Sequence, residues 1–82
     1  MKTTQYFRFL KQRPDRKQIR EEWILQTIAN PLHIEKQKDG RFRLWGKVKE
    51  ANNRYLRVVL LEDGETVHNV FFDRSFKGKA KI

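Results

Sequence analysis

Residues 41–49 alternate between polar and apolar side chains, which is typical of a β-strand with one exposed face. The side chains expected on the exposed face are Arg41, Arg43, Trp45, Lys47 and Lys49. Cations of this kind neutralise phosphate groups, and an aromatic ring that stacks on an unpaired base contributes about 1–3 kcal/mol. The strand is therefore predicted to present a surface that binds RNA.

The same surface has residues suited to RNA cleavage. Cleavage without a metal ion needs a base for the 2′-hydroxyl, cations for the charge of the phosphorane, and an acid for the leaving oxygen. His68 is a titrating candidate because imidazole changes charge near neutral pH. The candidate catalytic residues are His68, Arg57, Arg74 and Arg43, and the candidate RNA-binding residues are Arg41, Trp45, Lys47, Tyr55 and Lys77.

Some of these side chains also allow a purely structural interpretation. His68 would then be a structural histidine of a half-buried strand, and Trp45 would be a lid over a small core. Arg57 would pair with an acidic residue such as Glu50 or Glu62. Both interpretations remain open at the level of the sequence.

The last expected strand ends in an acid beside a guanidinium. Asp73 is expected to pair with Arg54 across the sheet, as a structural clamp. Arg74 is expected to point to the same face as His68. The second histidine, His33, lies at the start of the first expected strand, and a surface position without a function is the favoured interpretation.

The composition limits the class of protein. Eighty-two residues suffice for one domain, and the 38% hydrophobic content supports a small core. There is no cysteine, which excludes a disulfide framework and a thiolate metal site. The sequence also lacks a Walker loop, a GxGxxG motif, an HExxH motif and a nucleophile elbow, so neither a cofactor nor a metal is expected.

The charge balance indicates the kind of partner. A formal net charge of +9 fits a polyanionic partner such as nucleic acid, an acidic protein or an anionic membrane surface, and RNA or the ribosome is the favoured partner. No apolar run is long enough to span a bilayer, and the first residues lack the apolar region of a signal peptide. We therefore expect a cytoplasmic protein without a membrane partner.

Proline and glycine positions divide the chain into helical and extended parts. The prediction is a single α+β domain over residues 1–82, with an N-terminal helical segment packed on one face of a twisted antiparallel sheet of three or four strands. Residues 1–13 fit either a short helix, the favoured interpretation, or an irregular strand, and a helix capped by Asp15 is predicted over 15–29. The sheet is expected over 32–73, followed by a basic tail over 75–82.

Loop lengths predict the strand registers, because a shift by one residue exchanges the two faces of a strand. A three-residue loop over 51–53, with Asn53 in the left-handed conformation, keeps the apolar residues of two strands on one face. The pairs that this predicts are Val48 with Leu56 and Lys47 with Arg57. A two- or four-residue loop at Asp63-Gly64 predicts the pairs Val67 with Leu60, Phe71 with Leu56, His68 with Val59, Val70 with Arg57 and Phe72 with Tyr55.

The order of these features carries a resemblance to a known family. The features are a helical segment ending at Asn30-Pro31, a turn at Asp39-Gly40, the strand Tyr55-Leu56-Arg57-Val58-Val59, a turn at Asp63-Gly64 and a final Asp73-Arg74. Over residues 15–75 this order resembles the BrnT-type toxins of the barnase, EndoU, colicin and RelE-like group. The resemblance implies a metal-independent ribonuclease toxin that acts on RNA or on translating ribosomes and is held inactive by a cognate antitoxin. It also implies that the active surface is the sheet face opposite the helices.

Three classes of function therefore remain open from the sequence. The leading hypothesis is a RelE/BrnT-like ribonuclease toxin. The second is a noncatalytic module that binds nucleic acid or the ribosome through the same basic and aromatic face. The third is a domain that docks an acidic protein.

Overall fold

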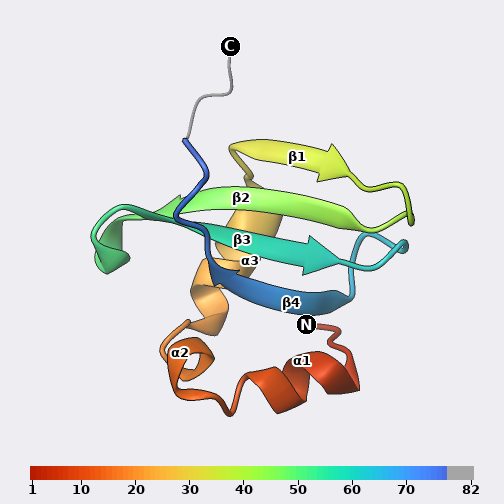
Figure 1. Cartoon of the computed structure of the whole chain (residues 1–82), viewed down its shortest axis with the longest axis horizontal. Coiled ribbons are helices and arrows are strands. Elements are labelled where there is room, and N and C mark those ends of the chain that lie inside the picture. The colour runs from red at the N-terminus through yellow and green to blue at the C-terminus, as the bar shows by residue number, and fades with distance from the viewer. Residues whose placement is uncertain (78–82) are drawn as a thin grey trace.

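The structure is a computed structural model that describes residues 1–77, and it has an α+β arrangement with the helices N-terminal to the strands (Figure 1). The helices are α1 (Gln5–Leu10), α2 (Pro14–Lys17) and α3 (Glu21–Ala29). The strands are β1 (His33–Lys36), β2 (Phe42–Val48), β3 (Arg54–Leu60) and β4 (Val67–Phe72). They form one antiparallel sheet in the order β1-β2-β3-β4, which confirms the predicted fold class.

The helices cover one face of the sheet and one of its edges. In Figure 1, α3 passes behind β2 and β3, while α1 and α2 lie beyond the edge strand β4. The segment after β4 crosses in front of the sheet (Figure 1). The face that α3 leaves uncovered is called the open face below.

The helix predicted over 15–29 is two helices, α2 and α3, with a break at residues 18–20. The break turns the chain so that Ile19 becomes fully buried in the core. Lys11 donates its ammonium protons to the carbonyl oxygen of Ile19 (2.6 Å) and to that of Arg16 (3.1 Å), which also accepts from the Ile19 amide (3.0 Å). At the Ile19 carbonyl, the Lys11 ammonium therefore supplies a hydrogen bond in place of the one that a continuous helix would have made.

The N-terminal segment combines a short extended stretch with the predicted helix. Thr3 forms a parallel bridge with Val67, and the Thr4 hydroxyl caps α1 by accepting from the Phe7 amide (3.0 Å). Arg16 donates from Nε to the Val70 carbonyl (2.9 Å). These contacts occupy the outer edge of β4, which would otherwise present unpaired backbone groups.

The core lies between the helices and the sheet. Its fully buried side chains include Ile24 from α3, Leu56 and Val58 from β3, and Val67 from β4. α3 approaches β2 closely at Gly46, where a Cβ would lie 2.6 Å from the Thr27 hydroxyl oxygen. Glycine at this position of β2 allows the helix to pack directly on the strand.

The hairpin between β2 and β3 has a longer loop than predicted. A turn of 3₁₀ helix over Lys49–Ala51 precedes Asn52 and Asn53, whose φ values of 60° and 59° are left-handed. The left-handed Asn53 is confirmed, whereas the predicted register is wrong by two residues. The observed pairs are Val48 with Arg54, Lys47 with Tyr55, Gly46 with Leu56 and Trp45 with Arg57. Because the loop still has an odd length, every side chain keeps its predicted face.

A β-bulge changes the faces of β4. Val67 pairs with Leu60 as predicted, but His68 is an extra residue, and Asn69 pairs with Val59. The other predicted pairs are therefore wrong: the structure pairs Val70 with Val58, Phe71 with Arg57 and Phe72 with Leu56. The bulge directs Val70 and Phe72 toward the helices. Val70 is buried in the core, and Phe72 packs against Trp23 with ring centroids 6.2 Å apart.

Candidate functional site on the open face

The strand registers arrange the open face in rows that run across the sheet. One row is His33, Trp45, Arg57 and Phe71, the second is Glu35, Arg43, Val59 and Asn69, and the third contains Lys47 and Tyr55. Arg41 precedes β2, beyond the second row. The face therefore combines cations with aromatic rings, as the sequence predicts.

The centre of the open face is a packed ion pair. Arg57 lies between two rings, with its Cζ 5.0 Å from the Phe71 centroid and 5.6 Å from the Trp45 centroid. Its Nη1 lies 3.6 Å from a carboxylate oxygen of Asp73, whose side chain is 9% exposed. Trp45 donates from Nε1 to the same carboxylate (2.9 Å). Arg57 and Trp45 thus have structural partners in this arrangement.

Phe76 covers Trp45 from the side of the solvent. The two rings are stacked, with centroids 4.9 Å apart and planes 10° apart, and Trp45 is only 4% exposed. Phe76 also meets the edge of Tyr55, with centroids 5.2 Å apart, and lies 6.0 Å from the His33 ring. A base can therefore stack on Trp45 only where Phe76 moves away.

One carboxylate links two strands in the second row. Glu35 lies 3.2 Å from His33 Nε2 through one oxygen and 3.6 Å from Arg43 Nη1 through the other. The sequence analysis did not select Glu35 and regarded His33 as a surface residue. The alternation along β1 indicates that His33 and Glu35 share one face. Their neighbours on β2 depend on the strand register, which the sequence analysis did not predict for this pair of strands.

His68 lies at the β4 edge, beside α1 rather than in the middle of the face. Its Nδ1 is 3.1 Å from the Thr4 hydroxyl, and its ring stacks on Tyr6 with centroids 4.8 Å apart. The Thr4 hydroxyl oxygen already accepts from the Phe7 amide. The Thr4 contact fixes the ring orientation through Nδ1, and Nε2 makes no hydrogen bond or ion pair among residues 1–77.

Burial and the nearby charge of Arg41 lower the pKa of His68. Burial removes water from the imidazolium, and a second cation repels its positive charge. The imidazole is therefore neutral at pH 7, the state in which it can accept a proton.

Asp73, unlike the neutral His68, is held in its charged form. Burial would raise the pKa of this carboxyl, but hydrogen bonds from Trp45 and Ser75 and the charge of Arg57 outweigh the effect and lower the pKa. The predicted clamp between Asp73 and Arg54 is not formed. Arg54 instead places its Cζ 4.0 Å from the Phe72 ring centroid.

The remaining predicted residues lie around the face. Lys47 and Tyr55 are paired neighbours at one end of it, and exposed Arg74 and Lys77 belong to the segment after β4. Arg74 and His68 lie near opposite ends of β4, so the structure does not bring these two candidates together. Of the predicted basic tail, residues 78–82 lie outside the described residues.

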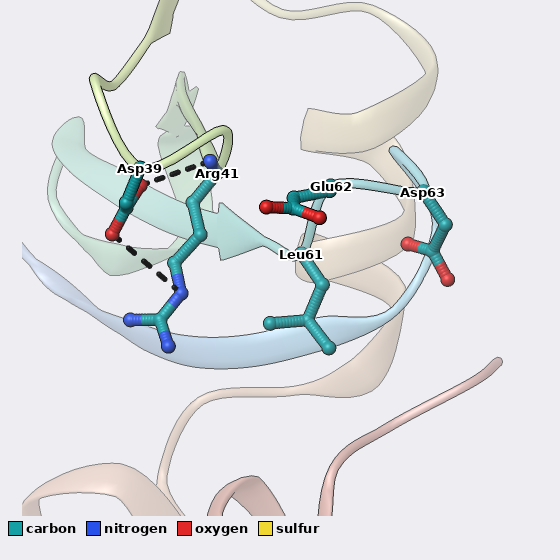
Figure 2. A pocket seen from close by; sticks show the side chains of 5 residues that line it. All are labelled: Asp39, Arg41, Leu61, Glu62 and Asp63. Atoms are coloured by element: carbon teal, nitrogen blue, oxygen red, sulfur yellow. Dashed lines mark hydrogen bonds and ion pairs between the residues drawn. The ribbon is translucent and has the colours of Figure 1, made fainter.

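Arg41 borders a surface pocket of about 400 Å³ between two turns (Figure 2). Asp39 accepts from the Arg41 amide (3.0 Å), and the guanidinium Nε lies 3.9 Å from the same carboxylate. Glu62 and Asp63 approach from the turn between β3 and β4 (Figure 2). Hydrogen bonds from the Thr66 side chain and from the Thr66 and Glu65 amides lower the pKa of Asp63 to about 2.

Comparison with known proteins found no matching protein family, curated protein or solved structure. Within residues 1–77, no group of three or more histidine, cysteine or acidic side chains is placed to hold a metal ion. In the same part of the chain, no helix has the length and apolar character needed to cross a membrane.

Proposed function

We propose that this chain is a metal-independent endoribonuclease toxin that binds RNA across the open face and is restrained by a cognate antitoxin. The observation that carries the proposal is the position of His68, a neutral imidazole held by Thr4 beside Arg41. Arg43 follows Arg41 by two residues along the same side of the chain, at a distance of about 7 Å. A base and one nearby cation thus lie at one corner of the face, and Arg43, whose Nη1 lies 3.6 Å from Glu35, is the next cation along the chain. We call this group the His68 corner (Tyr6, Arg41, Arg43 and His68).

The chemistry at this corner follows from the groups present. His68 accepts the proton of the 2′-hydroxyl, the 2′-oxygen forms a bond to phosphorus, and the bond from phosphorus to the 5′-oxygen breaks. Arg41 and Arg43 neutralise the extra charge of the phosphorane. Tyr6, whose ring stacks on His68, supplies a proton to the leaving 5′-oxygen, and the protonated His68 then returns its proton to the Tyr6 phenolate through water. The products are a 2′,3′-cyclic phosphate and a 5′-hydroxyl end.

The structure changes which variant tests this proposal best. Arg57 is paired with Asp73 and packed between two rings, so its replacement would disturb the fold together with any activity. His68→Gln is a cleaner change because the side chain lies at an edge. His33→Gln is the matched control, since it removes the other imidazole of the chain.

The test is cleavage of a single-stranded RNA by the purified chain in the presence of EDTA. We expect cyclic phosphate ends from the wild type and from His33→Gln, and a rate about 10²–10⁴-fold lower for His68→Gln, the usual effect of losing a general base. Induced expression in bacteria should stop growth with the wild type and not with His68→Gln. Absence of cleavage by the wild type, or full activity of His68→Gln, would contradict the proposal.

A second candidate function is noncatalytic RNA binding. It is favoured by the central ion pair, because Arg57 and Trp45 have structural partners and resemble a rigid platform. In that case RNA binds to the wild type, its affinity falls with salt, and the RNA stays intact. Selective capture of an acidic protein, with only weak RNA binding, would instead support the docking domain.

A further inference from the structure

A second pocket lies at the end of the sheet opposite the His68 corner, where side chains of the open face meet Arg54 and Phe72 from the helix-covered face. Its volume is about 290 Å³, and the residues that line it are Arg54, Tyr55, Phe72, Asp73, Arg74 and Phe76. We name it the Tyr55 pocket. We propose that the Tyr55 pocket binds one unstacked base of a single-stranded RNA, with Arg74 holding a phosphate next to that base.

The walls of the Tyr55 pocket are flat and aromatic. Tyr55 and Phe76 meet edge to face, with centroids 5.2 Å apart, and Phe76 is held in place by its stack on Trp45. The Arg54 guanidinium lies over Phe72 at 4.0 Å. Aromatic rings and arginine planes are the surfaces on which proteins stack bases that have left a helix.

The polar groups of the Tyr55 pocket suit a phosphate as well. Asp73 contributes a negative charge, but its oxygens already accept from Trp45 Nε1 and from the Ser75 amide and hydroxyl, and Arg57 lies 3.6 Å away. Its charge is therefore compensated within the protein. Arg54 uses Nε for the Ala51 carbonyl (3.0 Å), and exposed Arg74 makes no ion pair or hydrogen bond among residues 1–77. The charge left for a ligand is positive.

The location connects this pocket to the proposed cleavage site. The Tyr55 pocket lies at the Arg54 end of β3, whereas the His68 corner lies near its Leu60 end. Seven residues of β3 separate the two ends by about 20 Å. A strand of several nucleotides that occupies both places passes over Arg57 and Arg43. The inference rests on the proposed function in this respect, because the same RNA fills both sites.

The proposal assigns a role to two residues that the sequence analysis selected, Tyr55 and Arg74. Tyr55 is an expected RNA-binding residue, and in the pocket its ring would stack on the bound base. Arg74 is an expected catalytic residue, yet it lies far from His68, and binding a phosphate at the Tyr55 pocket is a role that its position allows. Arg54, Phe72 and Phe76 are additional members that sequence analysis did not select.

The experiment measures binding of the full chain to a labelled six-nucleotide oligouridylate with 2′-O-methyl groups, which block cleavage. An abasic oligomer with the same number of phosphates is the matched ligand. Tyr55→Leu has Phe9→Leu as its control, because Phe9 is a 65% exposed aromatic residue on α1. Arg74→Gln has Arg13→Gln as its control for the loss of one exposed charge.

We expect the wild type to bind the oligouridylate about tenfold more tightly than the abasic oligomer, as one stacked base would give. Tyr55→Leu should remove this difference and Phe9→Leu should keep it. Arg74→Gln should weaken binding of both oligomers more than Arg13→Gln does, and because it alters an exposed side chain it tests the pocket independently of any folding defect in Tyr55→Leu.

Two results would overturn the assignment of the Tyr55 pocket. One is equal affinity of the wild type for the two oligomers, and the other is an equal effect of Tyr55→Leu and Phe9→Leu. If RNA cleavage that depends on His68 persists in either case, the proposed function stands and only the base-binding pocket is wrong. If the wild type binds neither oligomer and cleaves no RNA, both proposals fail together.

Discussion

His68 shows how one residue can acquire its chemistry from neighbours that are distant in the sequence. Its ring is fixed by Thr4 and Tyr6, which precede it by more than sixty positions. Arg41 comes from a third part of the chain and disfavours the imidazolium form. The combination favours a neutral ring in the folded state, and the proposed role of His68 as a base requires that Nδ1 donates to Thr4 so that Nε2 is free to accept a proton.

The first prediction at this scale concerns stability and pH. The folded chain has a lowered pKa at His68, whereas the unfolded chain has the ordinary value of about 6.5. Below about pH 6.5 the unfolded chain binds the proton more readily, so stability is lost as the pH falls through the folded pKa and is regained above pH 6.5. Urea unfolding from pH 5 to 8 should show this loss in the wild type and a smaller one in His68→Gln. Parallel curves for the two proteins would contradict the prediction.

At the scale of elements, close approach of a helix and a strand sets the geometry of the core. Thr27 of α3 donates from its hydroxyl to the Trp23 carbonyl (2.9 Å) and lies against the bare Cα of Gly46 in β2. This contact places α3 behind β2 and β3 and leaves the opposite face free. The distance between the two elements is therefore the feature that a side chain at Gly46 would change.

The second prediction is that Gly46→Ala destabilises the protein by about 1–3 kcal/mol, a usual cost of overpacking a core. The new Cβ would lie 2.6 Å from the Thr27 hydroxyl oxygen and 3.1 Å from its methyl carbon. Thr27→Ala removes both atoms, so the double variant should recover part of the loss. Urea unfolding of the four proteins measures the coupling. Additive effects, with no recovery in the double variant, would show that the contact does not determine the packing.

At the scale of the whole molecule, the net charge of +9 and the open face act together. Excess positive charge attracts any polyanion, whereas the rows of the face determine which cations touch it. Each phosphate that a cation neutralises on a single strand makes the slope of log affinity against log salt concentration steeper by about 0.7. The salt dependence of the affinity therefore distinguishes direct contacts to phosphates from general electrostatic attraction.

The third prediction compares two double variants with the same net charge. Arg43→Gln with Lys47→Gln removes cations of the open face, and Arg13→Gln with Arg20→Gln removes cations of the helical part. For binding to a single-stranded oligonucleotide, the first pair should reduce the salt slope by about 1.4, from two contacts of 0.7 each, and the second pair should change it little. Equal slopes for the two double variants would mean that the open face is not the binding surface.

Local patterns in the sequence were enough to predict the fold class, the position of the turns and the composition of most of the open face. Alternation along residues 41–49 is a local pattern, and positive φ at Asn53 follows from the turn chemistry of one residue. These features depend on neighbours in the chain, so reading the sequence suffices. Even the wrong loop length between β2 and β3 kept the faces, because only its parity matters.

Several other features depend on long-range packing and could not be predicted from local patterns. The break before α3 exists because burial of Ile19 outweighs helical continuity, and the bulge at His68 allows Val70 and Phe72 to reach the core. The stack of Phe76 on Trp45 joins residues thirty-one positions apart. Each of these is a competition between local geometry and long-range packing, and no local pattern contains the packing partners that decide it.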